Sequence, residues 1–125
     1  MKNPAVYFEI PVTDLERATH FYEKVFGYTF VREEIHGNQM AHLPFQDKSR
    51  GISGSLAKGK TYAPSEQGTL IYLASSDIED TLKRAQALGS DILFPKTAVG
   101  SLGFVAEIKD SEGNRIGLHQ ELVRA

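Results

Sequence analysis

The stretch IPVTDLERATHFYEKVFG, residues 10–27, contains both ends of one amphipathic helix. Asp14 can accept a hydrogen bond from the free N–H groups of a first helical turn, as an N-cap residue does. Apolar residues then recur at helical spacing: Leu15, Ala18, Phe21, Tyr22, Val25 and Phe26. Gly27 can adopt the left-handed conformation that ends a helix. Upstream, apolar residues alternate with others, so we predict a strand over residues 4–12 and a helix over residues 14–26.

The pattern of strand, cap and helix occurs a second time. The segment LIYLASSD, residues 70–77, reads as a strand that ends in a second cap, Asp77. Apolar residues follow at helical spacing, and Gly89 closes the pattern; they are Ile78, Leu82, Ala85 and Leu88. The two caps lie 63 residues apart, about half of the 125-residue chain. The sequence therefore predicts two copies of one structural unit.

Each copy is predicted to continue with three strands. In the first copy they cover residues 28–35, 39–45 and 52–56, with a turn at residues 36–38. In the second they cover residues 91–94, 104–108 and 115–120, the first of them ended by Pro95. We therefore predict an α+β fold of two tandem βαβββ modules, about 4–57 and 69–121, with mixed sheets and both helices on one face.

Composition narrows the classes of function. The net charge is −2, which argues against a nucleic-acid partner, since such proteins usually carry a basic cluster. The chain has no cysteine, so disulfides, thiolate nucleophiles and cysteine metal sites are excluded. It has no apolar run long enough to span a membrane and no apolar signal-peptide core near its N-terminus. We expect a cytoplasmic protein without a membrane or nucleic-acid partner.

Two motifs point to a family. The first combines Val12, Asp14, Leu15, Ala18, Phe21, Tyr22, Phe26 and Gly27, and the second is DSEGN, with Asp110, Gly113 and Asn114. Together they resemble the vicinal oxygen chelate (VOC) superfamily, which includes glyoxalase I, bleomycin- and fosfomycin-resistance proteins and extradiol dioxygenases. The resemblance covers nearly the whole chain. It implies one glyoxalase-like domain, residues 1–125, whose two modules form a curved sheet around a cleft, and it implies a homodimer.

The resemblance also implies a divalent metal, held by His, Glu or Gln from the first and last strands of each module. The matching positions here are Tyr7, Leu70 and Gly117, and residues 54–56 supply no carboxylate or imidazole. These residues cannot provide the converging donors that a divalent ion needs. We therefore expect no metal and no other cofactor.

The alternation of side chains along a strand predicts which residues face the cleft. They are Tyr7, Glu9, Leu70, Tyr72, Arg115 and His119, and His42 is a further candidate on the third strand. Apolar and aromatic walls with a few polar groups are typical of a small-molecule site. For His42, a partly buried structural histidine is the alternative.

Glu9 and His119 are the candidate catalytic residues. A carboxylate within an apolar strand is costly unless it is hydrated or paired. In a dry cleft such a group can serve as a general base. The alternative is a structural Glu9 bonded to Arg115 or to a tyrosine. His119 could bond to an oxygen atom of a substrate, and its alternative is a half-exposed structural histidine.

Four functions remain open. The first hypothesis is a metal-independent protein that binds a small organic molecule, as the bleomycin-resistance branch does. The second is a lyase or isomerase in which Glu9 is the base and His119 or a tyrosine is its partner. The third, a metal-dependent glyoxalase I or dioxygenase, is disfavoured by the missing ligands. The fourth is a pure interaction module. No residue identifies the ligand.

Overall fold

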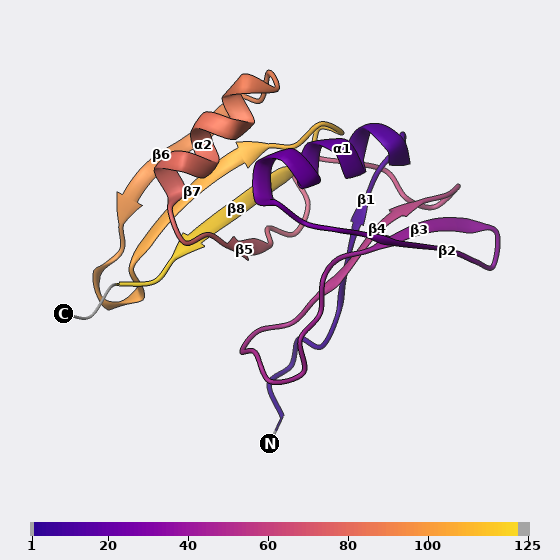
Figure 1. The fold of residues 1–125 in the computed structure, drawn as a ribbon, viewed down its shortest axis with the longest axis horizontal. Helices are drawn as coiled ribbons and strands as arrows, with labels where there is room; N and C mark the ends of the chain where they lie inside the picture. Colours follow the sequence, from indigo (N-terminus) through magenta and orange to yellow (C-terminus); the bar gives the residue numbers. More distant parts are fainter. Residues whose placement is uncertain (1, 123–125) are drawn as a thin grey trace.

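The computed structural model describes residues 2–122 and contains two four-stranded sheets, each with one helix (Figure 1). The first module consists of β1 (Phe8–Pro11), α1 (Leu15–Phe26), β2 (Val31–Ile35), β3 (Asn38–His42) and β4 (Gly54–Lys58). The second consists of β5 (Tyr72–Ala74), α2 (Ile78–Ala87), β6 (Ile92–Ala98), a 3₁₀ turn (Gly100–Leu102), β7 (Phe104–Lys109) and β8 (Arg115–Gln120). The predicted α+β fold of tandem βαβββ modules is confirmed.

The two sheets have the same topology. Their strand orders are β1-β4-β3-β2 and β5-β8-β7-β6, so β1 and β5 are edge strands in equivalent places. In both sheets the first strand of the module pairs in parallel with the last strand, and the other pairs are antiparallel. Helix α1 packs on sheet one and on α2, while α2 packs on sheet two. Both helices lie on the same side of the sheets (Figure 1).

The helix ends follow local chemistry. Asp14 caps α1 by accepting from the backbone N–H of Arg17 at 3.1 Å, and Asp77 caps α2 by accepting from Asp80 at 3.2 Å. Gly27 ends α1 with a φ of 76°, as its position predicts. One expectation was wrong: Leu88 lies after α2 and is 41% exposed, so it does not complete the apolar face of that helix.

The predicted end of a strand at Pro95 was also wrong, because β6 continues from Ile92 to Ala98. Strand β6 is an edge strand, and its pairing with β7 shifts register between Ile92 and Phe94 and again between Phe94 and Thr97. A proline at such an irregular edge removes no hydrogen bond that the sheet needs. The position in the sheet therefore decided the length of this strand.

The turn at residues 110–114 joins the two modules. The carboxylate of Asp110, which is only 5% exposed, accepts from the Tyr22 hydroxyl of α1 at 2.7 Å. It also accepts from the Asn114 side chain at 3.0 Å, and Asn114 donates to the carbonyl of Pro11 at 2.8 Å. We call this contact, made by Tyr22, Pro11, Asp110 and Asn114, the module joint. The second sequence motif thus fixes the turn between β7 and β8 against α1 and against the end of β1.

Glu112 adds a charged contact beside the module joint. Its carboxylate accepts from the backbone N–H groups of Thr13 and Asp14, both at 2.9 Å, and from Arg17 Nε at 2.7 Å. The Glu112 side chain has no exposed surface, while that of Arg17 is 52% exposed. Burial by itself raises the pKa of Glu112, but the hydrogen bonds from Arg17, Asp14 and Thr13 lower it to about 2.

Replacing Glu112 with glutamine is expected to flatten the acid limb of the stability curve. The folded-state pKa lies below the ordinary value of 4.5, so the ionised group stabilises the fold above about pH 4.5. This stabilisation is lost as the pH falls toward 2. Solvent screens the half-exposed Arg17, so we expect the free energy of unfolding of the wild type to fall by about 2 kcal/mol more than that of Glu112→Gln. Urea unfolding between these two pH values measures it.

Glu16→Gln is the matched control, since Glu16 also pairs with an arginine, Arg32 at 2.8 Å, but its side chain is 82% exposed. It should leave the acid limb unchanged. Asp110 works in the opposite direction, because burial raises its pKa despite the hydrogen bonds that it accepts. Only the difference between the wild type and Glu112→Gln therefore isolates Glu112. Equal acid limbs in these two proteins would contradict the assignment.

Candidate functional site

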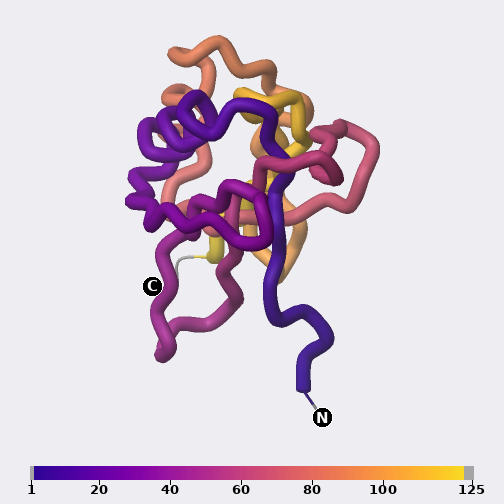
Figure 2. Tube along the Cα trace, turned by 90° about the vertical axis from the view of Figure 1, so that its right-hand side faces the viewer, coloured from indigo at the N-terminus to yellow at the C-terminus, as the bar shows by residue number. Residues whose placement is uncertain are grey.

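Glu9 lies on the face of β1 that points away from α1. Its neighbour Ile10 is 2% exposed and lies in the core, whereas Glu9 is exposed. The Tyr62 hydroxyl donates to Glu9 Oε1 at 2.7 Å, and the Tyr7 hydroxyl lies 3.3 Å from Glu9 Oε2. Tyr62 comes from the connecting segment that loops out beside β1 (Figure 2). Tyr62 therefore holds one oxygen of the Glu9 carboxylate, and the Tyr7 hydroxyl lies beside the other.

A row of hydrogen bonds continues from Tyr7 across sheet one. The Tyr7 hydroxyl lies 2.9 Å from Ser55 Oγ, which lies 2.6 Å from His42 Nδ1. His42 Nε2 in turn lies 2.7 Å from a carboxylate oxygen of Glu33. We call Glu9, Tyr7, Ser55, His42 and Glu33 the polar chain. The structure thus connects three of the predicted site residues, Tyr7, Glu9 and His42.

Sequence reasoning missed two members of the polar chain, Ser55 and Glu33. The signal for Ser55 is the strand register, because Ser55 pairs with both Glu9 and His42. That register depends on β4 beginning at Gly54 and ending at Lys58, two residues later than the predicted strand over 52–56. For Glu33 the signal is the alternation along β2, and no sequence pattern indicated that its carboxylate would reach His42.

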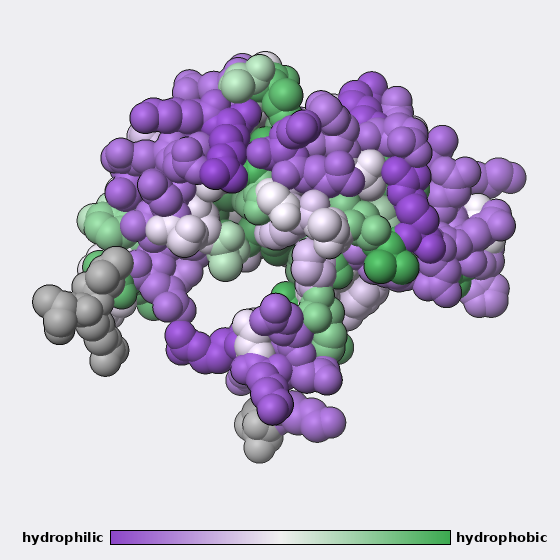
Figure 3. All heavy atoms as spheres, viewed as in Figure 1, coloured by the Kyte–Doolittle hydropathy of each residue, from purple (hydrophilic) through white to green (hydrophobic). Residues whose placement is uncertain are grey.

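A large hollow of about 760 Å³ lies between the edge strands β1 and β5. The predicted residues Tyr7, Leu70 and Tyr72 line it, together with apolar residues of the segment from Leu43 to Ser53. Figure 3 shows the opening, with hydrophobic atoms along part of its wall. The structure therefore gathers three predicted cleft residues in one hollow.

A smaller hollow of about 230 Å³ adjoins the large one and shares Thr69 and Ile71 with it. Two predicted residues line it, Glu9 and Arg115. They are not paired, because Arg115 binds the carboxylate of Glu107, whose residue is 7% exposed. Of the two partners predicted for a structural Glu9, a tyrosine bonds to it and Arg115 does not, and Glu9 is exposed rather than buried.

His119 lies apart from the other candidates. It is on β8 in sheet two, and its Nε2 atom contacts the backbone carbonyl of Leu102. A carbonyl only accepts, so this nitrogen carries the proton. His119 lines neither of the two hollows. The structure does not bring it near Glu9.

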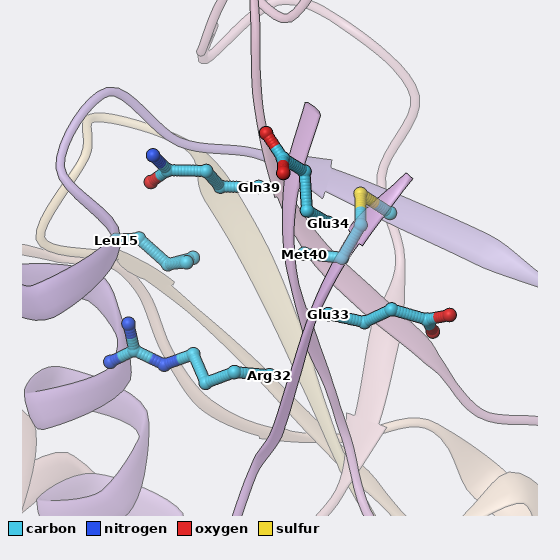
Figure 4. Close-up of a pocket in the computed structure, with 6 residues that line it drawn as sticks. All are labelled: Leu15, Arg32, Glu33, Glu34, Gln39 and Met40. Carbon is cyan, nitrogen blue, oxygen red and sulfur yellow. The ribbon is translucent and has the colours of Figure 1, made fainter. Parts of the chain in front are cut away.

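A third hollow lies beside α1 and the β2–β3 hairpin (Figure 4). In Figure 4, Arg32 points toward the side of Leu15 and Glu33 points to the opposite side. Arg32 is already occupied, because it binds Glu16 at 2.8 Å and donates to the Thr19 hydroxyl at 3.1 Å. One side of β2 therefore faces α1 and carries Arg32, and the opposite side carries Glu33 of the polar chain.

The donors do not fit the metal centre that the family likeness implies. Within residues 2–122, no group of three or more His, Asp or Glu side chains could hold an ion. Tyr7 is bonded to Ser55, and a Cβ atom at Gly117 would lie 2.5 Å from the ring of Tyr72. A ligating side chain at Gly117 would therefore displace Tyr72.

The family model described as Glyoxalase/Bleomycin resistance protein/Dioxygenase superfamily matches residues 5–118. No curated protein sequence matches the chain.

Several solved structures share the fold. TnmS3, an antibiotic binding protein from Streptomyces sp. CB03234, is 22% identical with a TM-score of 0.68, over 98% of this chain and 99% of that one. The trypanothione-dependent glyoxalase I of Leishmania major is 18% identical with a TM-score of 0.73, over 96% and 88%. A glyoxalase I mutant from Zea mays is 19% identical with a TM-score of 0.66 over 94% of this chain, which spans only 46% of the maize protein. At these identities the likeness concerns the fold.

Proposed function

Because the chain belongs to the glyoxalase/bleomycin resistance protein/dioxygenase superfamily, we propose that it binds a small organic molecule in the large hollow. The observation that carries this proposal is the hollow itself. Its volume of about 760 Å³ lies within the range of ligand sites, and its lining combines aromatic rings with few charges. Tyr72 and Phe45, which both line it, remain 48% and 68% exposed and are available to a ligand.

We propose that binding needs no divalent metal. The ligand positions of the family hold a phenol, an aliphatic side chain and a glycine, at Tyr7, Leu70 and Gly117. None of them is a donor of the kind that binds divalent ions in proteins. Shape and aromatic contact would therefore supply the affinity. A metal-dependent glyoxalase I or dioxygenase is correspondingly disfavoured.

We further propose that the protein is a cytoplasmic homodimer. The edge strands β1 and β5 have an unpaired side among the described residues, and Val6, next to β1, is 75% exposed. An unpaired edge can pair with a strand of another chain. Neither helix in residues 2–122 is both long and apolar enough to cross a membrane.

Replacing Tyr72 with alanine is expected to weaken binding about tenfold, because stacking on an aromatic ring contributes about 1 kcal/mol or more. The probe is the best ligand from a thermal-shift screen of neutral aromatic and oxygenated compounds, and calorimetry measures its affinity. Treating the wild type with EDTA should leave the affinity unchanged.

Phe94→Ala is the matched control, since Phe94 is a 40% exposed aromatic residue on β6 that lines neither of the two hollows. Thermal unfolding of both variants corrects for loss of folded protein. Equal affinities in Tyr72→Ala and Phe94→Ala would place the ligand elsewhere. Loss of binding in EDTA would overturn metal independence and favour the metal-dependent hypothesis instead.

A second candidate function is a lyase or isomerase with Glu9 as general base. One arrangement favours it: Glu9 lines the small hollow, the Tyr62 hydroxyl donates to its carboxylate, and the Tyr7 hydroxyl lies beside it. A general base must lie within hydrogen-bond reach of the proton that it removes. A molecule that extends from the large hollow into the small one would bring an acidic C–H group to Glu9.

A further inference from the structure

We propose that Glu9 exchanges a proton with His42 through the hydroxyl groups of Tyr7 and Ser55. The inference rests on the second candidate function, in which Glu9 removes a proton from a bound molecule. It explains a feature that binding alone does not use, namely the row of close polar contacts that leads from Glu9 in the small hollow across sheet one.

The strand register builds the row. Ser55 on β4 is the direct partner of Glu9 on β1 and of His42 on β3, so the three side chains lie side by side on one face. Tyr7 lies two residues before Glu9 and shares that face, as alternation along a strand requires. Glu33 on β2 completes the row. Each strand of sheet one thus contributes at least one member of the polar chain.

The distances give the row a direction. Tyr7 has a single hydroxyl proton, and its oxygen lies 2.9 Å from Ser55 Oγ but 3.3 Å from Glu9 Oε2. The shorter contact assigns the proton to Ser55. Ser55 Oγ lies 2.6 Å from His42 Nδ1, and His42 Nε2 lies 2.7 Å from a Glu33 carboxylate oxygen. A carboxylate only accepts, so Nε2 carries the proton, and Nδ1 of the neutral ring then accepts from Ser55. All donors point from Tyr7 toward Glu33.

This direction allows one proton to move from Glu9 to His42. When Glu9 has accepted a proton, its O–H bond breaks as the proton joins the Tyr7 oxygen. The Tyr7 proton moves to Ser55 Oγ at the same time, and the Ser55 proton moves to His42 Nδ1. Glu9 becomes a carboxylate, both hydroxyl groups are restored, and His42 becomes an imidazolium paired with the Glu33 carboxylate. One proton has moved, and the reverse sequence returns it.

The burial of Ser55 excludes a role for this serine as a nucleophile. A serine beside a histidine and a glutamate is a possible nucleophile, but Ser55 is 0% exposed, so no substrate reaches its oxygen. Both ends of the polar chain are accessible, because Glu9 and Glu33 are exposed. The charged or titratable groups that face His42 are Glu33 from β2 and, through Ser55, Glu9 of β1 and Tyr7, which precedes β1. A buried link between two accessible ends suits proton transfer.

The test follows the ring nitrogens of His42 by NMR during a pH titration of the ligand-free protein. We expect the neutral ring to carry its proton on Nε2. We also expect Glu9→Gln to displace the His42 titration midpoint by about half a pH unit, because linked groups titrate together. In a Ser55→Ala background the same Glu9→Gln change should have no effect on the midpoint.

Two phenol variants provide matched controls. Tyr7→Phe removes a hydroxyl of the polar chain and should abolish the coupling. Tyr62→Phe removes a hydroxyl that binds Glu9 but does not belong to the polar chain, so the coupling should persist. Coupling that survives Ser55→Ala and Tyr7→Phe would show through-space electrostatics and overturn the relay. A proton on Nδ1 of the neutral ring would overturn its direction.

The titration needs no ligand, so it is independent of the proposed function. Intact coupling in a protein that binds nothing from the screen would count against ligand binding alone. Absent coupling in a protein that binds a ligand would count against the relay alone.

Discussion

Replacing Asp110 with alanine is expected to lower the free energy of unfolding by about 3–5 kcal/mol, as measured by urea unfolding at neutral pH. The reason is the set of donors left without an acceptor. The Tyr22 hydroxyl, whose residue is 0% exposed, loses its bond at 2.7 Å, and two backbone N–H groups, of Glu112 and Asn114, lose theirs at 2.9 Å. Buried unpaired donors cost more than the bond itself contributes.

The effect should be specific to the module joint. Asp47→Ala, an exposed loop aspartate, is the matched control and should change stability by less than about 0.5 kcal/mol. Tyr22→Phe removes one donor together with its bond and should cost less than Asp110→Ala. An Asp110→Ala protein as stable as Asp47→Ala would contradict the joint as the element that fixes the modules together.

Replacing Glu9 with glutamine is expected to lower any base-catalysed turnover by about a hundredfold or more, since an amide cannot accept the proton. The reaction to measure is exchange of the acidic C–H proton of bound carbonyl compounds in D₂O, followed by NMR. Glutamine keeps the size of the side chain and can still accept from Tyr62, whose hydroxyl lies 2.7 Å from Glu9. Affinity should therefore change only modestly.

The same variant separates the two candidate functions. If the wild type catalyses no exchange but binds its ligand, the protein is a binder. If Glu9→Gln leaves exchange and affinity unchanged and only lowers the melting temperature, Glu9 is structural. Glu23→Gln is the control for charge, because Glu23 is an exposed carboxylate on α1.

The elements of the fold could be read from the chain because they depend on neighbours in the sequence. Asp14 and Asp77 cap helices through bonds to residues three positions ahead. Apolar spacing set the buried face of α1. The repeat at half-length then predicted two modules, and two sheets of identical strand order bear this out. Alternation likewise placed Ile10 in the core and Glu9 on the other face.

Only the tertiary structure decided which side chains meet. Arg115 binds Glu107 rather than Glu9, and His119, in sheet two, contacts Leu102 of the 3₁₀ turn. Ser55 entered the polar chain because β4 lies between β1 and β3, a neighbourhood that no local pattern specifies. Hydrogen-bond partners depend on sheet order and register, whereas caps and periodicity depend on the chain alone. The sequence by itself therefore determined the modules, and folding determined the site.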